Sequence, residues 1–282
     1  MPKPENIQDS IRSVGSVIWW HIEGDHLRSD IDALAQQHKI KELKKRARAS
    51  FTNALNEINR GEKGIVTRKI RDDFTILVYV LADVKNKRGA REMELGDQSW
   101  VAFDKMQNHV TWREADRRTK AFAERFHWYQ EHYTHGDIRA MVEREISKTG
   151  TIPLRSTGGV YFAPEGKMAR IEEVNEFLVG LGNDSHISMV SIRDEKGRQS
   201  IQRDFEQGAK MTLDSMLKTM DTALSEDGGL DPTKRNRMIR DLAKVRDDAE
   251  SMKMLIQFKS GKLDKALAKV NKQLLKAVAL GE

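Results

Sequence analysis

Apolar residues in the last third of the chain recur at the spacing of an amphipathic helix. The seam consists of Met238, Leu242, Val245, Ala249, Met252 and Ile256. Because its members are three or four residues apart, they share one side of a helix and require a partner helix. Asp231-Pro232 favours a helix start, and Asp227-Gly228-Gly229 predicts the turn of a hairpin with a helix over 199–226. We predict that the seam holds an assembly or partner surface.

A last helix follows Gly261 and combines an apolar stripe with a basic side. The stripe contains Leu263, Leu267, Val270, Leu274 and Val278, and the lysines opposite are Lys262, Lys265, Lys269, Lys272 and Lys276. A basic amphipathic helix can bind acidic partners, nucleic acid or a membrane surface. The stripe has no Trp or Phe anchor, which argues against a membrane. The alternative is a third bundle helix or an oligomerisation helix.

Alternating and β-rich segments dominate the middle of the chain. Residues 15–24 predict a strand with one apolar face, and a helix over 29–37 follows with Ser29 as its N-cap. Four short β-rich runs separated by turn residues, with Gly96-Asp97 between the last two, predict an antiparallel meander. These runs are 65–71, 75–84, 91–95 and 100–103.

A hairpin over 151–163, a helix over 168–181 and a strand over 186–193 predict a compact β-β-α-β unit. Further helices are expected over 41–59, 112–132 with Thr111 as N-cap, and 138–147 with Asp137 as N-cap. We therefore expect an α+β fold. The expected parts are an α+β domain with the meander (1–110), helices plus the β-β-α-β unit (111–198), and a helical hairpin or coiled coil with a basic C-terminal helix (199–282).

Two segments resemble an uncharacterised protein family encoded by phages, plasmids and other mobile elements. They are residues 65–105, ending in Val101-Ala102-Phe103-Asp104-Lys105, and residues 150–164, with Gly158-Gly159-Val160-Tyr161-Phe162-Ala163-Pro164. These motifs are structural. The resemblance therefore implies a genetic setting, and it implies no reaction.

Composition narrows the class of protein. The 282 residues suggest one large domain or two ordinary ones, and 33% are charged, which suits elongated helices with solvated faces. The chain has no cysteine, so disulfides and thiolate chemistry are excluded. No secretory signal and no long apolar run are visible. We expect a cytoplasmic protein that does not enter the membrane.

A second basic segment lies at residues 39–48. The net charge of +6 permits nucleic-acid binding without requiring it. Lys41, Lys44, Lys45 and Arg48 would share a side of the predicted helix and could lie on phosphates. Together with Lys262, Lys265, Lys269 and Lys272 they form the predicted nucleic-acid site, which would bind without sequence preference. The alternative is a solvated helix face.

His127, His132, His135 and Asp137 are the best candidate metal ligands. His127 and His132 are five residues apart, which places them on different sides of a helix. His21 and Glu23 share a strand face and offer a second, weaker possibility. No catalytic or cofactor motif stands out, so we expect neither a cofactor nor a required metal.

The sequence therefore favours a non-enzymatic assembly or binding protein. It would form a homo-oligomer, or bind a partner protein, through its C-terminal helices, and it could also contact nucleic-acid phosphates. One alternative is an adaptor for another protein machine without nucleic-acid contact. The other is a metal-dependent enzyme that uses the cluster from His127 to Asp137.

Overall fold

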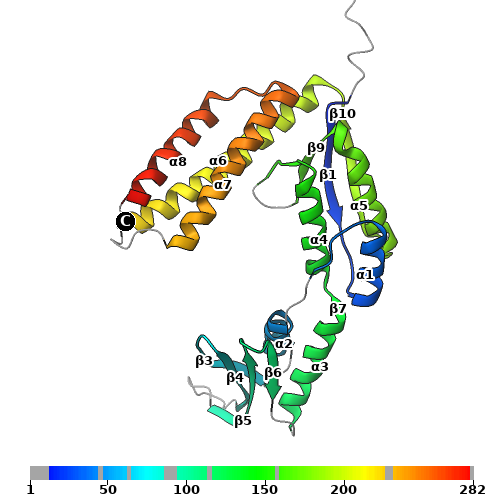
Figure 1. Cartoon of the computed structure of the whole chain (residues 1–282), viewed down its shortest axis with the longest axis vertical. Coiled ribbons are helices and arrows are strands. Elements are labelled where there is room, and N and C mark those ends of the chain that lie inside the picture. Colours follow the sequence, from blue (N-terminus) through cyan, green and yellow to red (C-terminus); the bar gives the residue numbers. More distant parts are fainter. Residues whose placement is uncertain are drawn as a thin grey trace, which may run out of the picture. The chain divides into compact units, whose positions relative to one another are not determined.

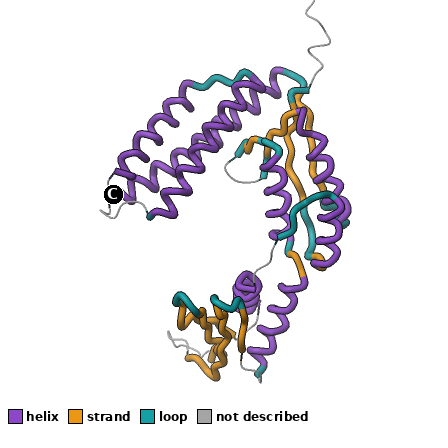
Figure 2. The backbone as a smooth tube through the Cα atoms, viewed as in Figure 1, coloured by secondary structure: helices purple, strands orange, loops and turns teal. Residues whose placement is uncertain are grey.

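The computed structural model describes residues 13–43, 47–61, 65–85, 94–112, 116–155, 159–225 and 231–279. The chain forms two compact units (Figures 1 and 2). Unit 1 consists of Met1–Ile22 and Val142–Glu282, and unit 2 consists of Glu23–Met141. Unit 2 is thus inserted in the sequence of unit 1, and each unit has its own buried core. The α+β fold class is confirmed.

Unit 2 contains the predicted antiparallel meander. Its strands β3 (Ile65–Asp72), β4 (Ile76–Lys85), β5 (Glu94–Asp104) and β6 (His109–Trp112) pair in sequence order. One strand runs from Glu94 to Asp104, so the turn predicted at Gly96-Asp97, between the runs 91–95 and 100–103, is wrong. Pairing with β4 continues through this point, and a register shift between Ala82 and Val84 accommodates it.

Helices α2 (Ala47–Gly61) and α3 (Arg117–Glu131) cover one face of this sheet. Phe51 of α2 is fully buried and packs edge to face on Phe122 of α3, with ring centroids 5.5 Å apart. The N-cap predicted at Thr111 is wrong because Thr111 lies in β6. Asp116 caps α3, and its carboxylate accepts hydrogen bonds from the Arg118 and Thr119 amides at 3.0 and 2.9 Å.

The other elements of unit 2 are β2 (His26–Leu27), β7 (His132–Tyr133), α1 (Arg28–Gln37) and the start of α4 (His135–Lys148). Strands β2 and β7 pair with each other. The predicted Ser29 cap is wrong, because α1 begins after Leu27 and has no side-chain cap. The N-cap predicted at Asp137 is wrong, because α4 begins at His135 and Asp137 lies in its first turn. Asp137 accepts from the Thr134 amide while the Thr134 hydroxyl accepts from the Asp137 amide, which is a reciprocal capping arrangement.

The sheet of unit 1 has the order β10-β1-β9-β8. Strands β8 (Ile152–Pro153) and β9 (Tyr161–Pro164), helix α5 (Met168–Gly180) and strand β10 (His186–Ile192) are the predicted β-β-α-β unit. A 3-10 turn, η1 (Glu165–Lys167), precedes α5. Strand β1 (Gly15–His21) enters between β9 and β10. Gly15 has a φ of +151°, and a Cβ there would lie 2.2 Å from the Ala163 carbonyl oxygen, so only glycine fits.

Three helices complete unit 1: α6 (Glu195–Ser225), α7 (Pro232–Ile256) and α8 (Gly261–Ala279). They run side by side in Figures 1 and 2 and share one core, to which Leu213, Met252 and Val270 contribute. Helix α6 runs unbroken through Gly208. Asp231 caps α7 as predicted, accepting from the Thr233 and Lys234 amides. The predicted turn at Asp227-Gly228-Gly229 lies outside the described residues.

Candidate functional site

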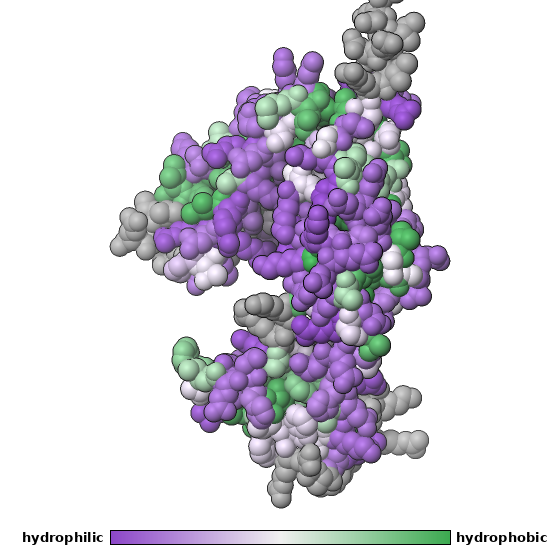
Figure 3. All heavy atoms as spheres, turned by 45° about the vertical axis from the view of Figure 1, so that its right-hand side comes forward, coloured by the Kyte–Doolittle hydropathy of each residue, from purple (hydrophilic) through white to green (hydrophobic). Residues whose placement is uncertain are grey.

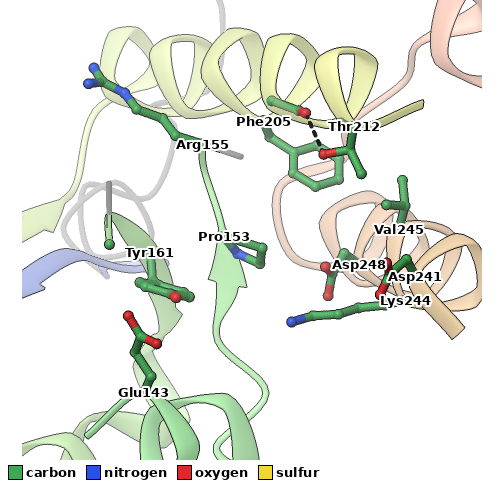
Figure 4. Close-up of a pocket in the computed structure, with 13 residues that line it drawn as sticks. Glu143, Pro153, Arg155, Tyr161, Phe205, Thr212, Asp241, Lys244, Val245 and Asp248 are labelled. Atoms are coloured by element: carbon green, nitrogen blue, oxygen red, sulfur yellow. Dashed lines mark hydrogen bonds between the residues drawn. The ribbon is translucent and has the colours of Figure 1, made fainter. Parts of the chain in front are cut away.

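A cavity of about 440 Å³ opens within unit 1. Its walls come from α4, from strands β8 and β9 with the adjoining Arg155 and Gly159, and from α6 and α7 (Figure 4). The charged residues of the lining are Glu143, Arg155, Asp241, Lys244 and Asp248, and the larger apolar and aromatic ones are Pro153, Tyr161, Phe205 and Val245. Apolar walls with a few convergent polar groups are typical of small-molecule sites.

Close packing of α6 against strands β8 and β9 shapes this cavity. A Cβ on Gly208 would lie 2.8 Å from the Leu154 carbonyl oxygen, so the glycine lets the helix approach the backbone after β8. Tyr161 stacks on Trp20 of β1 with ring centroids 5.2 Å apart. The Thr212 hydroxyl donates to the Gly208 carbonyl at 3.1 Å and is therefore already used within α6.

Carboxylates outnumber cations around the cavity. In Figure 4 the carboxylates of Glu143 and Asp248 and the ammonium of Lys244 project into the space, whereas the Arg155 guanidinium points away from it. Burial raises the pKa of Asp248 to about 6. The positive charge of Lys244 lowers this pKa, and the negative charge of Asp247 raises it further. Burial and Glu143 likewise raise the pKa of Tyr161. The cavity therefore contains acidic groups in surroundings that disfavour their charged forms.

A second hollow, of about 610 Å³, is an open groove between α7 and α8. The residues that line it are Ile239, Leu242, Ala243, Arg246, Leu267, Ala268, Asn271, Leu274 and Leu275. Ile239 is 45% exposed and Leu275 is 64% exposed, so large apolar side chains meet solvent along it. Figure 3 shows hydrophobic side chains gathered on the surface of the C-terminal helices among hydrophilic ones.

Positive charge concentrates on the same two helices. Residues 231–282 contain 13 Lys or Arg against 7 Asp or Glu, a difference as large as the net charge of the whole chain. Arg246 lines the groove and is exposed. Lys272 is four residues from Ala268 and three from Leu275, so it flanks the groove on the surface of α8. The groove thus combines an apolar floor with a basic rim.

The seam predicted from the sequence faces inward. Met238, Met252 and Ile256 are buried in the core shared with α6 and α8, and Leu242 and Val245 are partly buried against it. The helix partner that the seam requires is therefore supplied by the chain itself. Of the predicted interface residues, Leu242 also lines the open groove.

The predicted basic helix over 41–59 is wrong at its start. Helix α1 closes with Lys39 at a φ of +54° and with the Ile40 amide bonded to the Ala35 carbonyl at 2.8 Å, a Schellman-type end. Lys41 follows this end in an exposed loop, and Arg48 is exposed in the first turn of α2. Lys44 and Lys45 lie outside the described residues. Lys262, Lys265, Lys269, Lys272 and Lys276 are all exposed on α8, as predicted.

The histidine cluster is divided among separate roles. His127 packs edge-on against Trp112 and Phe126, and His132 stacks on Trp128 with ring centroids 4.5 Å apart. Asp137 is occupied at the start of α4. Across the residues that the structure describes, no three His, Asp or Glu side chains are placed to hold a metal ion.

Sequence reasoning missed Ile239, Leu275 and Asp248. Ile239 and Leu275 lie one position beyond the predicted apolar stripes, and a wider stripe would have signalled a second face on each helix. Asp248 is next to Asp247, and nothing in its local sequence shows that only Asp248 turns inward.

Within the described part of the chain, no helix combines the length and apolar character needed to cross a membrane. The model of the Family of unknown function (DUF6744) matches residues 13–280. The comparisons find no significant match to a curated protein or to a solved structure.

Proposed function

Since the chain belongs to the Family of unknown function (DUF6744), whose name states no activity, we propose a function from the α7–α8 groove. We propose a non-enzymatic assembly or adaptor protein that binds a partner protein through its C-terminal helices. The partner would insert one amphipathic helix into the groove, with acidic side chains flanking its apolar stripe. The observation that carries the proposal is the open apolar groove with its basic rim.

The dimensions of the groove suit a helix. Its lining covers two turns of α7, from Ile239 to Arg246, and two turns of α8, from Leu267 to Leu275. Two turns present apolar side chains at positions i, i+3 or i+4, and i+7, the pattern used in helix-in-groove recognition. Burying Ile239 and Leu275 would contribute roughly 25 cal/mol for each Å² of apolar surface removed from water.

Charge selects the occupant of the groove. A second copy of the same groove would bring another exposed Arg246 and Lys272 to the interface, and repulsion between the two basic rims is unfavourable. An acidic partner helix would instead pair with them. Self-association through these helices therefore ranks below binding of an acidic protein helix.

Nucleic acid is the second candidate partner, favoured by the five exposed lysines of α8. It would use the rim charges and leave the apolar floor uncovered. We also propose a phage or another mobile element as the genetic setting. The support for that setting is the resemblance of residues 65–105 and 150–164 described above.

The test is fluorescence anisotropy with designed peptides and the full chain. One labelled peptide carries a helical Leu stripe flanked by Glu, and its control carries the same stripe flanked by Lys. A labelled duplex DNA is the third probe. We expect micromolar binding of the Glu peptide and at least tenfold weaker binding of the Lys peptide. The affinity for the Glu peptide should fall moderately as the salt concentration rises.

Variants locate the site. Ile239→Asp and Leu275→Asp should each weaken binding of the Glu peptide at least tenfold, because each places a charge on the apolar floor. Met254→Asp is the matched control, since Met254 is 79% exposed on α7 and does not line the groove. Equal binding of both peptides, or tight binding of DNA alone, would contradict the proposal.

A further inference from the structure

We propose that the cavity among α4, β8, β9, α6 and α7 binds a small organic cation, an ammonium or amidinium group attached to an aromatic or apolar body. This inference concerns a different site from the α7–α8 groove and does not rest on the function proposed for it. The cavity of about 440 Å³ is large enough for a ligand of this class.

The polar side of the cavity selects positive charge. Asp241 has a partner in Arg237, at 3.8 Å, outside the cavity. Glu143 and Asp248 project inward from α4 and α7, and Lys244 is the one cation drawn projecting between them in Figure 4. A ligand cation would balance the remaining carboxylate and would approach both Glu143 and Asp248.

The apolar side of the cavity accepts the body of the ligand. Phe205 and Val245 come from helices, and Tyr161 is fixed in orientation by its stacking on Trp20. Aromatic faces attract cations as well as apolar groups, so the same walls serve both parts of the ligand. An anionic ligand would face both Glu143 and Asp248, with Lys244 alone projecting into the cavity to offset their charge.

The surroundings of Asp248 support a binding role. Among the described residues no hydrogen bond reaches its carboxylate, and burial disfavours its charged form. An apolar or amide side chain of similar size would be more stable at this position. Carboxylates kept in unfavourable surroundings inside a cavity are typical of ligand sites.

The experiment is isothermal titration calorimetry of the full chain with three probes of nearly equal shape. Benzylamine is charged positively, benzyl alcohol is neutral and benzoate is charged negatively. At pH 7.5 we expect saturable binding of benzylamine, and at least tenfold weaker binding of the other two. Affinity for benzylamine should rise from pH 5 to pH 7.5, because Asp248 loses its proton over this range. Lys244 and Asp247 act electrostatically on Asp248, and the other charged or titratable groups of the lining are Glu143, Arg155, Tyr161 and Asp241.

Two variants and a control complete the test. Glu143→Gln and Asp248→Asn should each weaken benzylamine binding at least fivefold while the chain stays folded. Asp247→Asn removes the same charge from an exposed neighbour, whose side chain is 73% accessible, and should change affinity less than twofold. Absence of saturable benzylamine binding up to about 10 mM, equal binding of benzyl alcohol, or full binding by both cavity variants would overturn the inference.

Discussion

Asp248 and Asp116 are two partly buried carboxylates whose surroundings move their pKa values in opposite directions. Burial raises the pKa of Asp248 to about 6. Burial would do the same at Asp116, but hydrogen bonds from Arg118, Ser99 and the Thr119 amide hold its pKa below the usual range. One carboxylate therefore stabilises the fold through its charge, and the other carries its charge at a cost in stability.

Replacing Asp248 with Asn should stabilise the protein at neutral pH. Because its folded pKa lies above its unfolded value, wild type loses stability as pH rises from about 4 to about 6, and the variant lacks this loss. Urea unfolding at pH 7.5 should show a gain of about 1–2 kcal/mol, shrinking at pH 4.5. A destabilised variant at pH 7.5 would contradict the argument.

The starts of helices and strands show which element boundaries local sequence determines. Asp231-Pro232 was predicted correctly because the capping side chain and the proline act within one turn. The start of α3 was predicted wrongly because Thr111 is used by β6, whose pairing with β5 depends on residues elsewhere in the chain. The missed continuity of strand β5 has the same cause. Its pairing with β4 overrides the local turn signal at Gly96-Asp97.

The two aspartate caps should differ in their contribution to stability. Asp231→Ala removes an exposed cap and should destabilise the protein by the smaller amount. Asp116→Ala removes a cap and also the carboxylate that bonds the buried Arg118 guanidinium at 2.6 Å. It should cost about 2–4 kcal/mol, even though Asp83 remains beside Arg118 at 2.7 Å. Urea unfolding of both variants at pH 7.5 measures the difference, and equal costs would refute it.

Long-range topology accounts for what the sequence could not predict about the whole molecule. Strand β1 pairs with β10, so His21 lies opposite His186. The segment Glu23–Met141, which lies between these two strands in the sequence, forms a separate unit. Local periodicity predicted the strands and the β-β-α-β unit but carried no information on this insertion. The cavity and the groove could not be predicted from the sequence either. Each is formed by helices whose facing sides are determined by tertiary packing and not by local sequence.

The two cores should respond separately to mutation. Phe122 is fully buried in unit 2, and Leu213 is fully buried in unit 1. Phe122→Ala should destabilise unit 2 by about 3–5 kcal/mol, and Leu213→Ala should destabilise unit 1 by about 2–5 kcal/mol. Differential scanning calorimetry should show that each variant lowers a different transition. A single transition lowered alike by both variants would mean that the units unfold together.

Binding of an acidic helix in the groove between α7 and α8 is tested most directly by methyl NMR of the full chain. The sample carries labelled Ile, Leu and Val methyl groups and is titrated with the Glu-flanked peptide. We expect saturable shift changes at Ile239, Leu242, Leu267 and Leu275, with Ile171 and Leu213 unchanged in the buried interior. Peptide binding that leaves the signals of Ile239 and Leu275 unshifted would show that the groove is not the binding site.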